Sequence, residues 1–220
     1  ARNKIKVDIN GTENNYFQGE EIDLPDAPKK DGEEFTHWED ENGNQVTDPY
    51  VVPNEEDKEV TLTPVYTNNE YTATFIISAE GTSVTYTTTK AKYTESVVVP
   101  ANPTAEVPAG YIFKGWAKTE GATEALADLG NMPVNGITFY AVFEANTDTA
   151  YTVKKFFMNE NGTDWKEPVD DVRYGTTEST VTLDFAKEVA EGFTIDEVNS
   201  TKSAVIVGDG STVLAYDQNV

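Results

Sequence analysis

His37 is the only histidine, so a Ser-His-Asp arrangement in this chain would need it as the base. A later stretch with a similar pattern has Gly115 at the corresponding position, so the shared scaffold does not require a base there. We therefore expect His37 to be a half-exposed strand residue. The chain has no cysteine, which removes disulfides, thiol nucleophiles and thiolate metal sites. One histidine without cysteine cannot form a histidine metal cluster, and we predict no metal site.

Carboxylates are numerous, with 39 Asp and Glu against 16 Lys and Arg. Glycoside cleavage needs two acids that face each other across a cleft, but among so many acids we expect neighbours such as Glu20-Glu21 and Asp170-Asp171 in solvated turns and edges. The segment Asp40-Glu41-Asn42-Gly43-Asn44 has the alternating oxygens of a calcium loop, yet its glycine is at the fourth position and not at the sixth. We predict a hairpin turn there. The sequence also lacks a Gly-rich phosphate loop, so nucleotide binding has no support. From these points together we expect no catalytic residues and no cofactor.

Aromatic side chains are the candidates for ligand contacts, because their faces can stack on sugar C–H surfaces. Trp38 and Trp116 occupy equivalent positions in two similar stretches, which predicts that both fill cores. Trp165 follows a turn and lies outside any apolar strand, so we predict that it is exposed and contacts a ligand. Tyr86 and Tyr93, in a Thr-rich stretch, are weaker candidates of the same kind.

An intramolecular amide bond between a lysine and an asparagine is left open by the spacing. Such a bond needs a lysine amine made neutral by burial, a side-chain amide beside it and an acid that moves protons. Lys154 and Lys155 lie on an expected opening strand, and Asn219 lies near the expected closing one. These positions have the required topology, and the sequence leaves both outcomes open.

The elements that must position these residues form a repeat. Phe35-Thr36-His37-Trp38 aligns with Phe113-Lys114-Gly115-Trp116, and the closing stretch over residues 60–66 aligns with residues 137–143. Each copy predicts two opening strands, an extended Pro-x-x-Pro segment, a short aromatic strand, a turn-rich excursion and a closing strand. Two copies of one structural unit explain these matching residues and their order better than chance.

The last third of the chain differs from the repeat. It opens with a predicted strand over residues 151–157 and turns at Asn161-Gly162-Thr163. Residues 184–190 predict a short helix. Gly208-Asp209-Gly210-Ser211 lies between two β-branched runs and predicts a hairpin connection.

Composition indicates a mostly β protein of small α+β modules, with 29 Thr and 23 Val but only 6 Leu. Polar stretches near residues 68 and 147 divide it into modules over residues 1–67, 68–146 and 147–220. The linkers are too short for independent tumbling, so we expect an extended, semi-rigid rod of three modules. The abrupt ends of the sequence indicate a segment of a longer protein.

A net charge of −23 makes nucleic acid an improbable partner, since the surface repels phosphate. The same charge repels other copies of the chain, so we expect a monomer. No apolar run approaches 18 residues, and we expect no membrane insertion.

The phrase Tyr111-Ile112-Phe113-Lys114-Gly115-Trp116, closed by residues 139–143, resembles the internalin-type B-repeat, or Listeria–Bacteroides repeat. Residues 71–145 match this pattern well. Residues 4–67 match more loosely, with Glu33-Glu34 where the pattern has Gly-Tyr. The resemblance implies a small β-grasp, ubiquitin-like fold in each copy.

Residues 147–220 are similar to a module that often accompanies such repeats, the mucin-binding-protein-like (MucBP) module. The matching residues are Tyr151-Thr152-Val153, residues 170–176, Glu191-Gly192-Phe193 and residues 208–214. These motifs mark turns and strand ends and carry no chemistry.

Together the resemblances imply a non-enzymatic segment of an extracellular, cell-surface adhesin of a Gram-positive bacterium. Its role would be adhesion to a host or mucosal glycoprotein, a mucin or a polysaccharide, or that of a stalk. The alternative is an accessory carbohydrate-binding segment of a secreted enzyme. An exposed aromatic platform would favour carbohydrate binding, and buried aromatics would favour the stalk.

Overall fold

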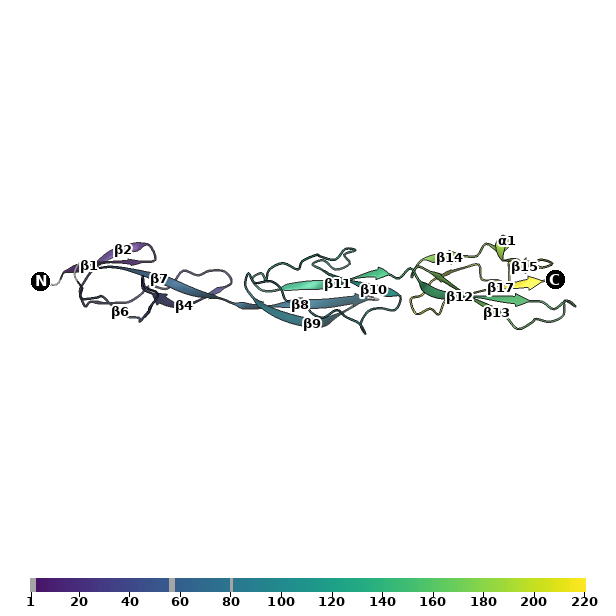
Figure 1. Cartoon of the computed structure of the whole chain (residues 1–220), viewed down its shortest axis with the longest axis horizontal. Helices are drawn as coiled ribbons and strands as arrows, with labels where there is room; N and C mark the ends of the chain where they lie inside the picture. The colour runs from purple at the N-terminus through teal and green to yellow at the C-terminus, as the bar shows by residue number, and fades with distance from the viewer. Residues whose placement is uncertain (1–2, 56–57, 80) are drawn as a thin grey trace. The chain divides into compact units, whose positions relative to one another are not determined.

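The computed structural model describes residues 3–55, 58–79 and 81–220. These residues form seventeen strands and one helix of four residues, so the predicted mostly β fold is confirmed (Figure 1). The chain divides into two compact units, one of residues 1–74, 88–99 and 129–137 and the other of residues 75–87, 100–128 and 138–220. A first sheet lies in the first unit and a third sheet in the second, while strands of a second sheet are divided between them.

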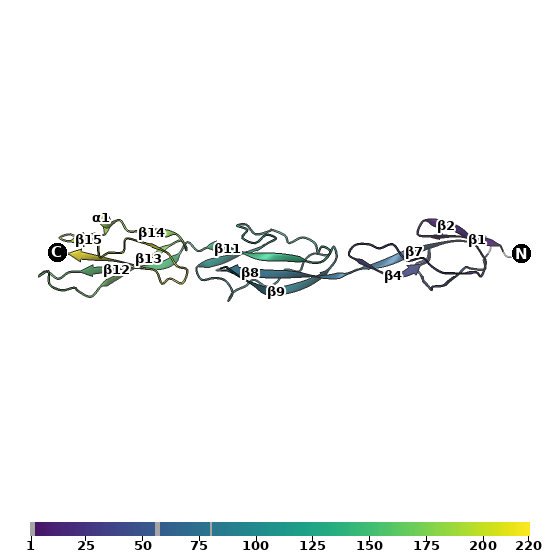
Figure 2. The same cartoon turned by 180° about the vertical axis from the view of Figure 1, so that it is seen from behind.

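The first sheet has the strand order β2-β1-β7-β4-β5. Figure 2 labels β1, β2, β4 and β7 of this sheet as seen from behind. Its strands are β1 (Lys4–Ile9), β2 (Thr12–Phe17), β4 (Glu33–Glu39), β5 (Gln45–Val46) and β7 (Glu59–Asn68), and a separate pair consists of β3 (Glu21–Ile22) and β6 (Tyr50–Val51). Asn10 and Gly11 join β1 to β2 with φ of 48° and 85°, as a two-residue type I′ hairpin requires. β1 also pairs in parallel with β7, which is the last strand of this sheet in chain order.

One side of the first sheet is a closed apolar core. Val7, Val52 and Leu62 have no exposed surface, and Trp38 is 4% exposed, which confirms that this tryptophan is a core residue. Directly after β4, residues 40–44 form the predicted hairpin turn into β5. Asp40 Oδ1 accepts the backbone N–H groups of Asn42 and Asn44, so this carboxylate stabilises the turn itself.

The second sheet has the order β10-β11-β8-β9. Its strands are β8 (Glu70–Ala79), β9 (Thr82–Lys92), β10 (Tyr111–Ala117) and β11 (Ile137–Ala145). The register of β10 against β11 shifts between Phe113 and Gly115, and that of β4 against β7 shifts between Phe35 and His37. The two aligned Phe-x-x-Trp phrases therefore carry the same bulge, which confirms the repeat at the level of backbone geometry.

The third sheet has the order β13-β12-β17-β15, with a separate pair of β14 and β16 beside it. Its strands are β12 (Thr149–Phe157), β13 (Val169–Gly175), β15 (Thr194–Asp196) and β17 (Val213–Asn219), and the pair is β14 (Thr180–Thr182) and β16 (Ser203–Val205). The predicted helix is present but shorter than expected, as α1 (Phe185–Glu188). β12 pairs in parallel with β17, so this sheet also joins its first strand to its last.

The predicted hairpin at residues 208–211 is wrong. β16 pairs with β14, whereas β17 pairs with β12 and β15, so the Gly-rich segment connects two different sheets. The backbone of Ile206 bonds residues on the β14 side, donating to the Ser179 carbonyl at 3.0 Å and accepting from Glu178 at 2.8 Å. The turn residues at 208–211 predict a reversal of the chain. However, β16 pairs with β14, which lies earlier in the chain, and does not pair with β17.

The first core provides a direct test of the packing. Replacing Leu62, which has no exposed surface, by Ala should cost about 2–5 kcal/mol, because the lost methyl groups leave a cavity. Native-state hydrogen exchange should show this loss at the amides of β1 and β7. The matched control is Thr61→Ala on the exposed side of the same strand, where we expect a change of only about 0.5 kcal/mol. Equal effects of the two variants would contradict the assigned faces of β7.

Candidate functional site

The tryptophans separate as the sequence predicts. Trp38 and Trp116 are 4% and 3% exposed, while Trp165 is 41% exposed. The backbone of Trp165 is held by a bridge to Met158, just beyond the end of β12. Its side chain is therefore exposed beside the end of β12, outside the strands of the third sheet.

The two tyrosine candidates are engaged within the protein. Tyr86 stacks on Trp116 with ring centres 5.9 Å apart and donates its hydroxyl to the Ala101 carbonyl at 3.2 Å. The Tyr93 ring lies so close to Gly32 that a Cβ there would be 2.5 Å from the ring. Both side chains are half-buried and packed against neighbours within the protein.

His37 is a half-exposed strand residue, as predicted. Its Nε2 lies 2.9 Å from Glu39 Oε1, and its Nδ1 lies 3.0 Å from the Thr36 hydroxyl. The single hydroxyl proton of Thr36 also has the Val65 carbonyl as an acceptor at 3.0 Å. Together these contacts form a short chain of polar groups along β4, from Glu39 through His37 and Thr36 to the Val65 carbonyl.

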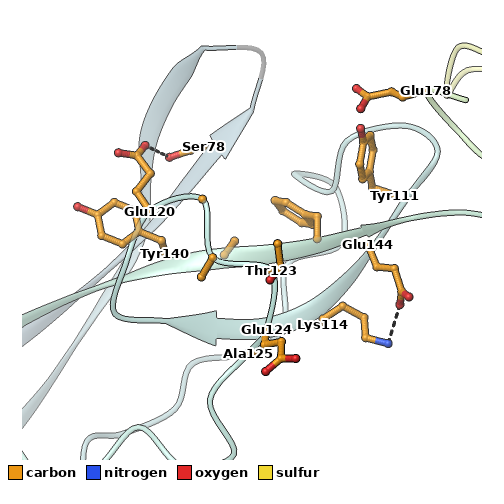
Figure 3. A pocket seen from close by; sticks show the side chains of 14 residues that line it. Ser78, Tyr111, Lys114, Glu120, Thr123, Glu124, Ala125, Tyr140, Glu144 and Glu178 are labelled. Carbon is orange, nitrogen blue, oxygen red and sulfur yellow. Dashed lines mark hydrogen bonds and ion pairs between the residues drawn. The ribbon is translucent and has the colours of Figure 1, made fainter. Parts of the chain in front are cut away.

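A pocket of about 1120 Å³, which we call the Glu120 pocket, lies against β10 and β11. Figure 3 shows Glu120 beside Ser78 and Lys114 beside Glu144. The ion pair between Lys114 Nζ and Glu144 Oε2 is 2.8 Å long. The residues that define it here are Ser78, Tyr111, Lys114, Glu120, Tyr140 and Glu144. Sequence reasoning did not find this pocket, because its charged residues come from an excursion and from alternate strand positions that look like ordinary solvated surface.

The acids of the Glu120 pocket suit binding better than proton transfer. Hydrogen bonds from the Ser78 and Ser83 hydroxyls, at 2.6 and 2.9 Å, lower the pKa of Glu120. A hydrogen bond to the Glu178 carboxylate raises the pKa of Tyr111 to about 12. The carboxylate therefore stays ionised and the phenol stays protonated at neutral pH. Carboxylates outnumber the one lysine of the lining, so anionic ligands are repelled.

A charged network joins β13 to α1 in the third sheet. Arg173 makes a two-pronged contact with Glu188 at 2.6 and 2.8 Å and also donates to Asp171. The bond from Arg173 lowers the pKa of Glu188, whose side chain is only 12% exposed. The buried Tyr216 ring lies beside this pair, with its hydroxyl 3.3 Å from Glu188 Oε2. The network fastens the only helix of the described residues to the sheet.

The lysines considered for an amide crosslink are engaged in ion pairs. Lys154 Nζ lies 2.9 Å from Asp170, and Lys155 Nζ lies 3.0 Å from Asp171. Their side chains are 37% and 24% exposed, so both lysines lie at the surface beside carboxylates. Asn219 is at the end of β17, opposite Thr194 of β15.

In residues 3–55, 58–79 and 81–220, no group of three or more His, Asp or Glu side chains is arranged to hold a metal ion. The same residues contain no helix of the length and hydropathy needed to cross a bilayer.

Comparison with known proteins identifies the family of the repeat. The Listeria-Bacteroides repeat domain matches residues 4–64 and again residues 71–142. The chain belongs to this family. Internalin H of Listeria monocytogenes serovar 1/2a is 35% identical over 143 residues, which are 63% of the chain and 24% of that relative. The chain thus spans about a quarter of the length of internalin H, and the matched repeats end before the third sheet begins.

The Arg173–Glu188 contact predicts a specific dependence on pH. Because the folded pKa of Glu188 is lowered, its stabilisation is present above its ordinary value of 4.5 and is lost as the pH falls from there through the folded value. Glu188→Gln should cost about 1–3 kcal/mol at pH 7 and should flatten the loss of stability in acid. Hydrogen exchange of the β17 amides, measured at pH 7 and at pH values below 4.5, shows both the loss of stability and the flatter acid dependence.

The exposed residue Glu191, three positions further on, is the matched control. Glu191→Gln should leave the stability at pH 7 and its acid dependence close to those of the parent chain. An unchanged acid dependence in Glu188→Gln would show that other carboxylates account for it.

Proposed function

We propose that the chain is a non-enzymatic segment of a bacterial surface protein and that it serves as a stalk. Three modules in series, residues 1–67, 68–146 and 147–220, would hold other parts of the parent protein away from the cell. Membership of the repeat family and the similarity to internalin H support the surface location. The observation that carries the stalk role is how the chain passes from one sheet to the next.

Asn69 is the single residue between β7 and β8, and both of its backbone groups are hydrogen-bonded. Its N–H donates to the Gly32 carbonyl at 2.8 Å, and its own carbonyl accepts the Tyr93 N–H at 2.8 Å. Asn68 Nδ2 adds a bond to the Tyr93 carbonyl at 2.8 Å. A connection fixed in this way lacks the freedom of a flexible linker.

Asn146 repeats this arrangement between β11 and β12. Its N–H donates to the Gly110 carbonyl at 2.7 Å, and its carbonyl accepts the Thr177 N–H at 2.9 Å. Gly32 directly precedes β4 and Gly110 directly precedes β10, with φ of +75° and +77°. A Cβ at Gly110 would lie 2.4 Å from Gly208, so both junctions need a glycine for close approach. The same device at two junctions supports a stalk of ordered units.

The finer fold and module assignments are part of this proposal. A β-grasp-like arrangement is supported by the first and third sheets, in each of which a hairpin leads with a strand that pairs in parallel with the closing strand. The MucBP-like identity of residues 147–220 rests on its sequence motifs. The excess of negative charge supports a monomer.

Adhesion is the second candidate, and the exposure of Trp165 favours it. In that case the third module would bind a host or mucosal glycoprotein, a mucin or a polysaccharide. An accessory carbohydrate-binding segment of a secreted enzyme would use the same side chain. Because Tyr86 and Tyr93 are engaged inside the protein, Trp165 would be the main contact.

Backbone hydrogen exchange tests the stalk. The Asn69 and Asn146 amides should exchange much more slowly than those of an unstructured peptide, because each is bonded across its junction. The exposed turn residue Gly121 gives a comparison within the same chain. Exchange of the two junction amides at unstructured rates would contradict the stalk, since the connections would then be free linkers.

Binding to a mucin and glycan array separates stalk from adhesin. For a stalk we expect no saturable binding at high micromolar protein and physiological salt. Saturable binding that Trp165→Ala abolishes would instead establish the adhesive role. The control variant is Tyr174→Ala, which removes an aromatic side chain that is 62% exposed elsewhere on the third sheet.

A further inference from the structure

We propose that the parallel pairs β1–β7 and β12–β17 are shear clamps, which let the first and third sheets bear a pulling force along the chain. The inference deepens the stalk role and rests on it for the origin of the force. The mechanical property itself belongs to the sheets and can be measured whether or not the chain is a stalk.

The third sheet shows the geometry most fully. The chain enters this sheet at the start of β12 and leaves it at the end of β17, and the two strands are parallel neighbours. Tension on the two ends therefore pulls the neighbouring strands in opposite directions along their length. Six residue pairs are in register, from Thr152 with Val213 to Phe157 with Gln218.

Hydrogen bonds at both ends and packing in the core reinforce the β12–β17 pair. Backbone bonds extend its ends, from Thr152 N–H to the Thr212 carbonyl at 2.9 Å and from Met158 N–H to the Gln218 carbonyl at 3.0 Å. Val153 and Leu214 are opposite each other with no exposed surface, so sliding the strands must also open the apolar core. Ladder bonds and core packing thus resist the same displacement.

The first sheet has the same geometry with a shorter ladder. Lys4 begins β1, Asn68 ends β7, and four residue pairs are in register, from Lys6 with Glu59 to Ile9 with Leu62. The flanking bond is from Asn10 N–H to the Leu62 carbonyl at 3.0 Å. Because fewer bonds share the load, we expect the first sheet to yield at a lower force than the third.

The physical basis is the direction of the load relative to the ladder. Interstrand hydrogen bonds run across the strands, so a force along the strands loads all of them together, whereas a force that separates one end breaks them in turn. Forced unfolding depends on the unfolding rate, and therefore on how many interactions must be lost at the barrier. Pulling direction should change the unfolding force without any change in the fold.

Single-molecule force spectroscopy of the full chain tests this with two attachment geometries. The absence of native cysteine lets introduced thiols define the points of attachment. Asp148→Cys with Val220→Cys pulls the opposite ends of β12 and β17, and Asp148→Cys with Ser211→Cys pulls the ends that lie together. We expect the first geometry to need at least about twofold more force at the same loading rate.

The two geometries share one attachment point and use exposed positions, so each controls for the other. The released length identifies the event, since an extended chain spans at most about 3.6 Å per residue. Equal forces in both geometries, or a larger force for Asp148 with Ser211, would overturn the clamp. Such a result would leave the stalk in place if the Asn69 and Asn146 amides remain protected from exchange.

Discussion

The parallel pairing of an opening strand with a closing strand is the constraint on which the first and third sheets depend. β1 pairs with β7 across about fifty residues of intervening chain, and β12 pairs with β17 across a similar separation. Once these strands are neighbours, the second strand of the opening hairpin lies on one side of the pair. The other side is taken by β4 and β5 in the first sheet and by β15 in the third. The remaining segments between the paired strands are turns, short strand pairs, extended pieces and the short helix α1.

Local signals were sufficient for the parts of this fold that depend on local geometry. The Asn-Gly turn at residues 42–43, the end of the strand after Phe157 and the core positions of Trp38 and Trp116 follow from turn chemistry and from the repeat. The connection at residues 208–211 was predicted incorrectly because pairing is decided by which distant edge is free. A turn sequence reports that the chain reverses and does not report the partner of the following strand.

The candidate ligand residues show the same limit. The exposure of Trp165 could be predicted, since the residues around it are polar. The engagement of Tyr86 with Trp116, and of Tyr93 with Gly32, depends on contacts made thirty or more residues away in the sequence. The Glu120 pocket was missed for a related reason, because Ser78 and Glu120 meet only when the excursion folds back on the sheet. No spacing rule relates such residues in a chain with 39 acids.

The junctions have a consequence for how such a protein can change over generations. Asn69 and Asn146 are each held through main-chain N–H and carbonyl groups, and the steric requirement is for glycine at Gly32 and Gly110. Because main-chain groups make the central bonds of each joint, most substitutions of neighbouring side chains would leave those bonds in place, and a repeat could be added or removed with few compensating changes. In the proposed stalk, the length of the parent protein would then change in whole-repeat steps.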